Sequence, residues 1–158
     1  MASAWVSALR SLARQRLTEA QLWKRLQRKS YEEAEVRAAV ERCRSIGLLD
    51  DRLFAQLYVA GSRKSVGDAR LVAELVRKGI DRDAALEAVR DGERSEPARC
   101  DAAIEKLLRT KPQTSYPSAA RALERYGFPA SLIYRSLREH AARFGPLAPK
   151  HPELSAMS

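Results

Sequence analysis

The same arrangement of apolar residues recurs three times along this chain, at a spacing of 49 and then 48 residues. One set of equivalent positions is Leu26, Leu75 and Leu123, and a second is Tyr31, Ile80 and Phe128. Further along each unit, the matching positions are Val36, Ala85 and Ile133, then Val40, Val89 and Leu137. A period of this length is typical of stacked repeats, in which each unit buries its apolar face against a neighbour.

Each repeat has the pattern of three short helices. Strand-like alternation is absent over any useful length, and helix-forming Ala, Leu, Arg, Glu and Lys dominate. Gly79 is expected to end the helix that contains Leu75, since glycine enters the left-handed conformation without steric cost, and Asp81 is expected to cap the next helix. Capping-box spacing is present twice, at Thr18/Gln21 and at Ser30/Glu33. We predict an all-α fold of three tandem three-helix repeats that form an elongated, curved array.

The predicted repeats cover residues 1–49, 50–95 and 96–144. Residues 145–158 contain Pro146, Pro149 and Pro152 and have no equivalent in the repeats. Because proline cannot continue a helix, we predict a disordered, Pro-rich tail there.

Composition and cysteine content indicate where in the cell the chain is expected. No apolar run approaches the ~20 residues that a membrane span requires, and Cys43 and Cys100 form neither a CxxC pair nor a disulfide framework. The first eighteen residues are rich in Arg and lack acidic residues, as in a mitochondrial transit peptide. The same segment fits the first helix of a repeat, with Trp5, Leu9 and Leu12 on one face. We favour that folded helix, and we expect a cytoplasmic monomer.

Basic residues give the chain a formal net charge of +9, from 29 Lys+Arg and 20 Asp+Glu. They recur on the second helix of each repeat and at the end of the first helix of the middle repeat. The candidate partner-binding residues are Arg25, Arg28, Lys29, Arg63, Lys64, Arg70, Arg77, Lys78, Arg121 and Arg125. A basic residue in a last helical turn also complements the helix dipole and needs no partner for that. The recurrence of the whole stripe, however, favours an anionic partner, either nucleic-acid phosphate or an acidic protein surface.

Catalytic and metal-binding patterns are missing. His140 and His151 both lie in the last nineteen residues, and no HExxH, phosphate-binding glycine loop or Ser-His-Asp set is present. Cys43 is in phase with Val36 and Val40, which indicates a core residue. The adjacent acids at Glu32-Glu33 and Asp50-Asp51 stand where helices are expected to begin. We therefore predict a protein that is not an enzyme and has no catalytic residues, metal site or cofactor.

The middle repeat resembles a known family. Residues 47–59 read GLLDDRLFAQLYV, and residues 74–80 read ELVRKGI. This closely resembles the RecX family of bacterial recombination regulators, whose middle repeat has the pattern G-[LI]-[LI]-D-D-x-x-[FY]-A-x-x-[YFW]-[VI], followed by a basic turn and L-x-x-K-G-I. The resemblance extends over about residues 5–144.

The resemblance implies a regulator that acts on the RecA recombinase in homologous recombination, DNA repair and the SOS response. Such a protein binds the RecA nucleoprotein filament and mostly inhibits its ATPase, strand-exchange and coprotease activities. Its partners would be the RecA filament and single- or double-stranded DNA, with no membrane partner.

An alternative remains, in which the chain binds nucleic acid directly through tandem helix-turn-helix-like units. The basic residues gather toward helix C-termini and form no recognition helix with base-reading side chains at its N-terminus. This placement favours the regulator over the direct nucleic-acid binder.

Overall fold

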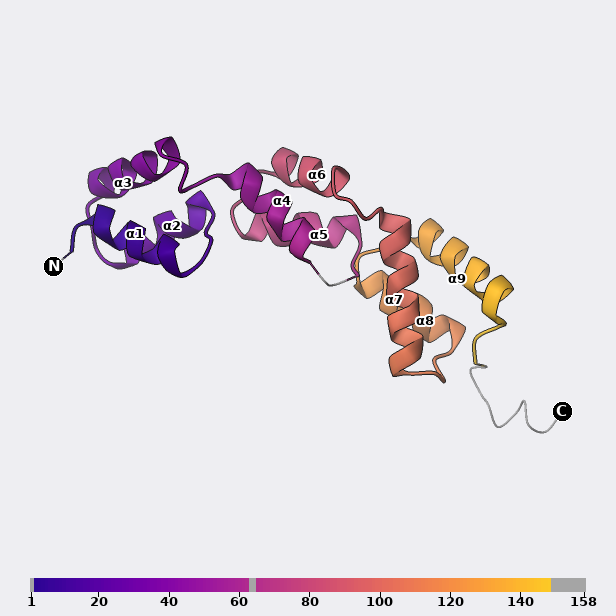
Figure 1. Ribbon diagram of the computed structural model, residues 1–158. Helices are drawn as coiled ribbons and strands as arrows, with labels where there is room; N and C mark the ends of the chain where they lie inside the picture. Colours follow the sequence, from indigo (N-terminus) through magenta and orange to yellow (C-terminus); the bar gives the residue numbers. More distant parts are fainter. Residues whose placement is uncertain (1, 63–64, 149–158) are drawn as a thin grey trace. The chain divides into compact units, whose positions relative to one another are not determined.

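The computed structural model describes residues 2–62 and 65–148 (Figure 1). Over these residues the chain is helical, and extended backbone pairs only in an isolated bridge between Ser115 and Ala148. The helices of the described part are α1 (Ala4–Arg14), α2 (Glu19–Arg28), α3 (Glu33–Ser45), α4 (Asp51–Gly61), α5 (Asp68–Arg77), α6 (Arg82–Arg90), α7 (Glu96–Thr110), α8 (Tyr116–Arg125) and α9 (Ala130–Phe144). The all-α prediction is therefore confirmed, and the Arg-rich N-terminal segment forms helix α1.

Local capping explains where two of these helices begin. The Thr18 hydroxyl accepts a hydrogen bond from the Gln21 backbone N–H at 3.1 Å, and the Gln21 side-chain oxygen accepts one from the Thr18 backbone N–H at 3.0 Å. This is the predicted capping box at the start of α2. Asp81 caps α6 in the predicted way, through its carboxylate. Both side chains satisfy backbone donors that have no partner inside their helix.

The second predicted capping box is wrong. Helix α3 begins at Glu33 with Glu32 in the N-cap position, and no side chain makes a capping hydrogen bond there. Ser30 instead has a left-handed backbone with φ 65°, like Gly79 and Gly127 at φ 95° and 92°. Since these three residues are equivalent in the repeat, Ser30 fills the position of the helix-ending glycine.

Each end of the chain has its own apolar core. Helices α1–α3 enclose the first, whose fully buried large side chains are Leu22, Leu26, Val36, Val40 and Cys43. Helices α7–α9 enclose another, built around Ile104, Leu123, Phe128, Ile133 and Leu137. In the middle of the sequence, α4 packs on α6, and Leu71, Leu75, Ile80 and Val89 are buried. The residues that define the period are thus buried in these cores, apart from the partly buried Tyr31, which packs against the first.

The chain divides into two compact units. The first unit holds the residues up to Gly61 together with Val72–Asp91, and the second holds Ser62–Leu71 together with the residues from Gly92 onward. The boundary therefore passes through α5, between Leu71 and Val72. It differs from the predicted repeat limits at residues 49 and 95, which remain a prediction.

Within the first unit, the start of α2 contacts the end of α5. The Thr18 hydroxyl donates a hydrogen bond to the carbonyl of Lys78. The Glu19 backbone N–H donates to Asp51 Oδ1 at 2.9 Å, which ties the same turn to the start of α4. A Cβ atom on Gly79 would lie 2.3 Å from the Ala20 Cβ. Only glycine therefore allows this close approach.

Within the second unit, the equivalent residues make an equivalent joint. The Gly67 backbone N–H donates to the Tyr126 carbonyl at 2.8 Å, and the Asp68 backbone N–H donates to Glu96 Oε2 at 2.7 Å. A Cβ atom on Gly127 would lie 2.7 Å from the Arg70 Cβ. Thus the start of one middle helix meets the glycine turn of the next, as it does in the first unit.

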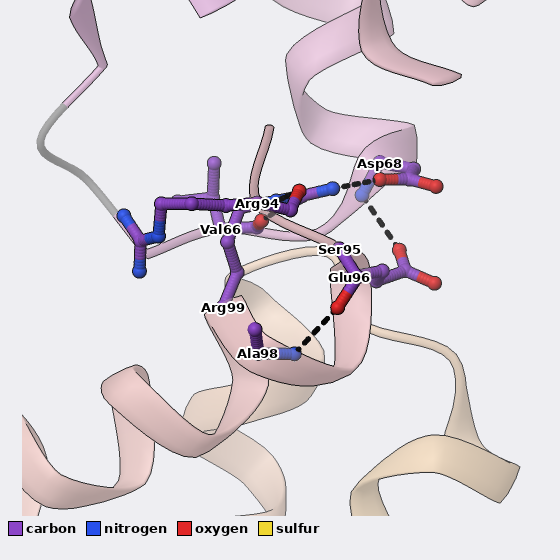
Figure 2. A network of polar contacts seen from close by, with 7 residues as sticks. All are labelled: Val66, Asp68, Arg94, Ser95, Glu96, Ala98 and Arg99. Carbon is purple, nitrogen blue, oxygen red and sulfur yellow. Dashed lines mark hydrogen bonds and ion pairs between the residues drawn. The ribbon is translucent and has the colours of Figure 1, made fainter. Parts of the chain in front are cut away.

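A buried arginine fixes the segment before α5. Figure 2 shows Arg99 of α7 pointing toward Val66 and Asp68. Its side chain is 7% exposed, donates to the Val66 carbonyl and forms an ion pair with Asp68. It also donates from Nε to the Arg94 carbonyl at 3.4 Å. A buried guanidinium needs such partners because an unpaired buried charge is strongly unfavourable.

The predicted tail is only partly described. Leu147 packs against the core of α7–α9, and Ala148 makes the bridge to Ser115. The disorder expected for residues 145–158 stays a prediction. The part of that prediction from residue 149 onward lies outside the described residues.

Candidate partner-binding surface

The predicted basic residues occupy matching places on three helices. Arg28, Arg77 and Arg125 are the last residues of α2, α5 and α8, and all three are exposed. Lys29 and Lys78 directly follow the first two helices. At a helix C-terminus a cation faces the partial negative charge of the unpaired carbonyls. The same local chemistry thus places a basic side chain at each helix end.

Most of these cations are not neutralised within the protein. Arg25, Arg28, Lys29, Arg77, Lys78, Arg121 and Arg125 form no ion pair with any residue that the structure describes. By contrast, Arg37, Arg44 and Arg52, on other helices, pair with Glu33, Glu19 and Glu87. The ends of the middle helices therefore keep their charge available for an external anion.

Two of the candidates make other contacts. The Lys78 ammonium lies 5.4 Å from the centre of the Tyr58 ring, within the range of a cation–π interaction. Arg121 Nη2 donates to Ser118 Oγ at 3.3 Å on the same helix. Both contacts leave the positive charge in place.

The remaining candidates differ in position. Arg25 is half-buried in the last turn of α2, and Arg70 is half-buried in the first turn of α5 rather than the last. Arg63 and Lys64 lie outside the described residues, so their predicted place in the surface stays a prediction.

The structure brings some candidates together and separates others. Arg70 and Arg125 line one cavity in the second unit. In the first unit, the start of α2 lies against Lys78, whereas Arg28 and Lys29 lie at its far end. A ten-residue helix is about 15 Å long, so these two basic groups are separated by about that distance.

Sequence reasoning missed two members of the surface. Lys106 and Lys111, at the end of α7, line the same cavity as Arg70 and Arg125. A signal was available, because Lys111 follows the first helix of its repeat about where Lys64 follows the first helix of the middle repeat. That equivalence alone does not predict a shared cavity, because the sequence does not show which helix ends lie together.

The cysteines have the character of core residues. Cys43 and Cys100 are fully buried. Burial raises the pKa of both thiols above the ordinary value of 9.0, although nearby Arg42 opposes the effect at Cys43 and Ser136 opposes it at Cys100. A reactive cysteine needs the opposite shift. The interpretation of Cys43 as a core residue is confirmed.

Family models match both of the first two repeats. A model described as the first three-helix domain of RecX covers residues 4–43, and one described as the second three-helix domain covers residues 50–89. The chain belongs to the RecX family. The two matched ranges contain α1–α3 and α4–α6, apart from the last residues of α3 and α6.

Named relatives extend this similarity beyond the two matched domains. The regulatory protein RecX of Thermobifida fusca is 34% identical over 141 residues, with 83% of this chain and 75% of the relative covered. That of Thermus thermophilus is 31% identical over 131 residues, with 83% and 87% covered. That of Syntrophotalea carbinolica is 40% identical over 91 residues, but the match spans only 59% of its length and 56% of this chain. These relatives carry the name of a regulatory protein.

Solved structures show the same fold. The crystal structure of RecX from Lactobacillus salivarius superposes with a TM-score of 0.74 over 86% of this chain and 93% of that chain, at 20% identity. The fold prediction of three-helix repeats is thereby confirmed. Separately, none of the helices within residues 2–62 and 65–148 has the length and hydrophobicity to cross a membrane.

Proposed function

We propose that this chain binds the RecA nucleoprotein filament and inhibits its DNA-dependent ATPase, and with it strand exchange and coprotease activity. The observation that carries the proposal is the arginine at the last residue of α2, α5 and α8, which forms no ion pair with the residues that the structure describes. A repeated cation suits a repeated anionic target, and a nucleoprotein filament is such a target. Membership in a family of RecX regulatory proteins supports the same partner.

The proposed action is binding alone. Complementary charge speeds association and orients two surfaces as they meet. Exposed leucines in the first unit, Leu53 and Leu57 on α4 and Leu86 on α6, add apolar area of the kind that protein interfaces bury. A protein held across neighbouring RecA subunits would restrict the movements that ATP turnover requires. No cofactor or chemical step is part of this proposal.

The test reverses the charge at the three helix ends. The variant Arg28→Glu, Arg77→Glu, Arg125→Glu changes the net charge from +9 to +3 and leaves the buried core untouched. We expect at least about 100-fold weaker inhibition of the RecA ATPase, equivalent to about 2.7 kcal/mol of binding free energy. Circular dichroism should show unchanged helix content.

A matched variant separates position from net charge. Arg14, Arg90 and Arg138 are exposed and lie on α1, α6 and α9, so their exchange for glutamate gives the same net charge of +3. This control should inhibit nearly as well as the unmodified protein. If both variants lose inhibition of the RecA ATPase equally, the effect is one of overall charge. If the test variant inhibits fully, these three helix ends do not take part in binding.

A further inference from the structure

The second unit contains a cavity of about 330 Å³ between the first turn of α5 and the ends of α7 and α8. This volume lies at the lower end of the range of about 300–1,000 Å³ that small-molecule sites occupy. All of its lining residues belong to the second unit. Its position at the joint between two middle helices was not evident from the sequence.

The charge in this cavity has one sign. Arg70, Lys106, Lys111 and Arg125 line it, and none of its described lining residues is a carboxylate. Lys106, Lys111 and Arg125 form no ion pair within the described part of the chain. The C-termini of α7 and α8 each contribute about −0.5 charge and the N-terminus of α5 about +0.5, so the full positive charges of Lys106, Lys111 and Arg125 outweigh the helix dipoles. The cavity therefore favours an anion.

The residues that line the cavity suit a ligand larger than a bare ion. Val66, Ala103, Leu107 and Ala122 form an apolar side, and Tyr126 adds an aromatic residue. Ser65 and Thr110 supply hydroxyl groups. Inorganic phosphate would use the cations and leave the apolar side unfilled. A phosphate joined to a sugar and a base would use both.

The walls are also fixed before any ligand binds. Arg99 holds Val66 and Asp68 through its buried guanidinium. The Gly67–Tyr126 backbone hydrogen bond and the close packing of Gly127 on Arg70 join the α5 side to the α8 side. A preorganised site loses little conformational entropy on binding.

We propose that this cavity binds the phosphate of a nucleotide, with the cations on the phosphate and the apolar side against the sugar or base. The ligand is either a free nucleotide or one nucleotide unit of a single strand, since both present the same chemistry. The inference concerns the chain alone and does not depend on RecA, so either proposal can fail without the other.

The experiment titrates the ¹⁵N-labelled full chain with thymidine 5′-monophosphate and follows the backbone amide signals. We expect saturable shifts at the lining residues Ala103, Leu107 and Thr110, and weaker binding of inorganic phosphate or of thymidine. The variant Lys106→Gln, Lys111→Gln should weaken nucleotide binding at least about tenfold, or about 1.4 kcal/mol. The control Arg109→Gln, Arg138→Gln removes two exposed cations that do not line the cavity and should change the affinity less than about twofold.

Four results would overturn the proposal: equal loss in both variants, shifts located elsewhere, inorganic phosphate binding as tightly as the nucleotide, or a tetraglutamate peptide binding the cavity as tightly. A short oligodeoxythymidylate identifies the source of the ligand. If it shifts the same amides and displaces the mononucleotide, the ligand is a unit of the strand. If only the mononucleotide binds, the ligand is a free nucleotide, and both results support the phosphate chemistry.

Discussion

At the scale of single residues, three equivalent positions show how one backbone requirement is met by two residue types. Ser30, Gly79 and Gly127 all have left-handed backbones. At Gly79 a Cβ atom would also collide with Ala20, and at Gly127 with Arg70. Ser30 is exposed, so its side chain extends into solvent. Glycine is thus required where another repeat packs closely and is only preferred where none does.

This difference predicts opposite effects of two substitutions. Gly79→Ala should lower the free energy of unfolding by about 2–5 kcal/mol, because a left-handed alanine costs about 1–2 kcal/mol and overpacking adds about 1–3 kcal/mol. Ser30→Gly removes a similar backbone cost from the folded state. Glycine also favours the unfolded chain by about 0.5–1 kcal/mol through its greater conformational entropy, so the free energy of unfolding should rise by only about 0.5 kcal/mol. Urea unfolding midpoints measure both. A neutral Gly79→Ala variant would contradict the close packing of α2 on α5.

A second prediction concerns Asp51, which accepts the Glu19 backbone N–H. Burial raises the pKa of this carboxyl above its ordinary value of 3.8, against the lowering effect of that hydrogen bond. At a pH between the pKa of Asp51 in the unfolded chain and its higher pKa in the folded protein, the folded state binds more protons than the unfolded state. The contribution of Asp51 to the free energy of unfolding therefore falls as pH rises through this window.

Asp51→Asn keeps an oxygen acceptor and removes the titration. We expect the variant to lose this part of the pH dependence and to be at least as stable as the unmodified chain near neutral pH. Urea midpoints between about pH 4 and about pH 7 provide the measurement. Asp83→Asn is the control, because Asp83 is exposed and its carboxylate is not among the groups that shift the pKa of Asp51. If both variants follow the unmodified pH profile, the assignment to Asp51 is wrong.

At the scale of helices, an acidic residue from the following repeat fixes the first residue of a middle helix, both at α2 and at α5. Asp51 at the start of α4 receives the first N–H of α2, and Glu96 at the start of α7 receives the first N–H of α5. Each acid lies near a helix N-terminus, where negative charge is favoured. The first helix of one repeat thereby sets where the middle helix of the previous repeat begins.

Arg99 is expected to strengthen the second of these joints. Arg99→Met fits the same space but leaves the Val66 carbonyl and the Asp68 carboxylate without their donor. The free energy of unfolding should fall by about 1.5–3 kcal/mol, the range for hydrogen bonds to charged groups. Arg94→Met loses only an exposed hydrogen bond to Ser65, so a change within about 0.5 kcal/mol is expected. Thermal denaturation compares the two, and equal effects would contradict a special contribution from the buried guanidinium.

At the scale of the whole molecule, charge is distributed unevenly among the predicted repeats. Residues 1–49 carry ten basic and five acidic side chains, residues 50–95 carry nine of each, and residues 96–144 carry nine and five. The middle repeat is neutral overall, yet Arg77 and Lys78 still lie together at the end of α5. We therefore expect the positions of the charges to affect binding more than the net charge does.

Salt dependence distinguishes the two functions considered for this chain. Binding to naked single-stranded DNA should weaken with salt, with a log–log slope of about −0.7 per phosphate contact. Binding to a preformed RecA filament should show a shallower slope, because the exposed leucines add an apolar part that salt does not screen. Titrations of both targets over one salt series provide the measurement. If the two slopes are identical and the filament is bound no more tightly than naked DNA, the result favours a direct nucleic-acid-binding protein.

The sequence alone determined the features that depend on neighbours along the chain. Helices, their glycine ends, the caps at Thr18 and Asp81 and the basic residue at each helix end follow from local chemistry at helical spacing. The period of 49 and 48 residues then predicted the repeated core, because equivalent apolar residues must be buried in the same way.

Tertiary structure decided what depends on residues far apart in sequence. Arg70 and Arg125 are separated by 55 positions, and only the contact between the start of α5 and the turn after α8 brings them to one cavity with Lys106 and Lys111. The burial of Arg99 and the left-handed Ser30 were likewise invisible to local patterns. Helical periodicity specifies which face of a helix is apolar, but the joints between repeats fix which charged ends meet, and those joints form only when the chain folds.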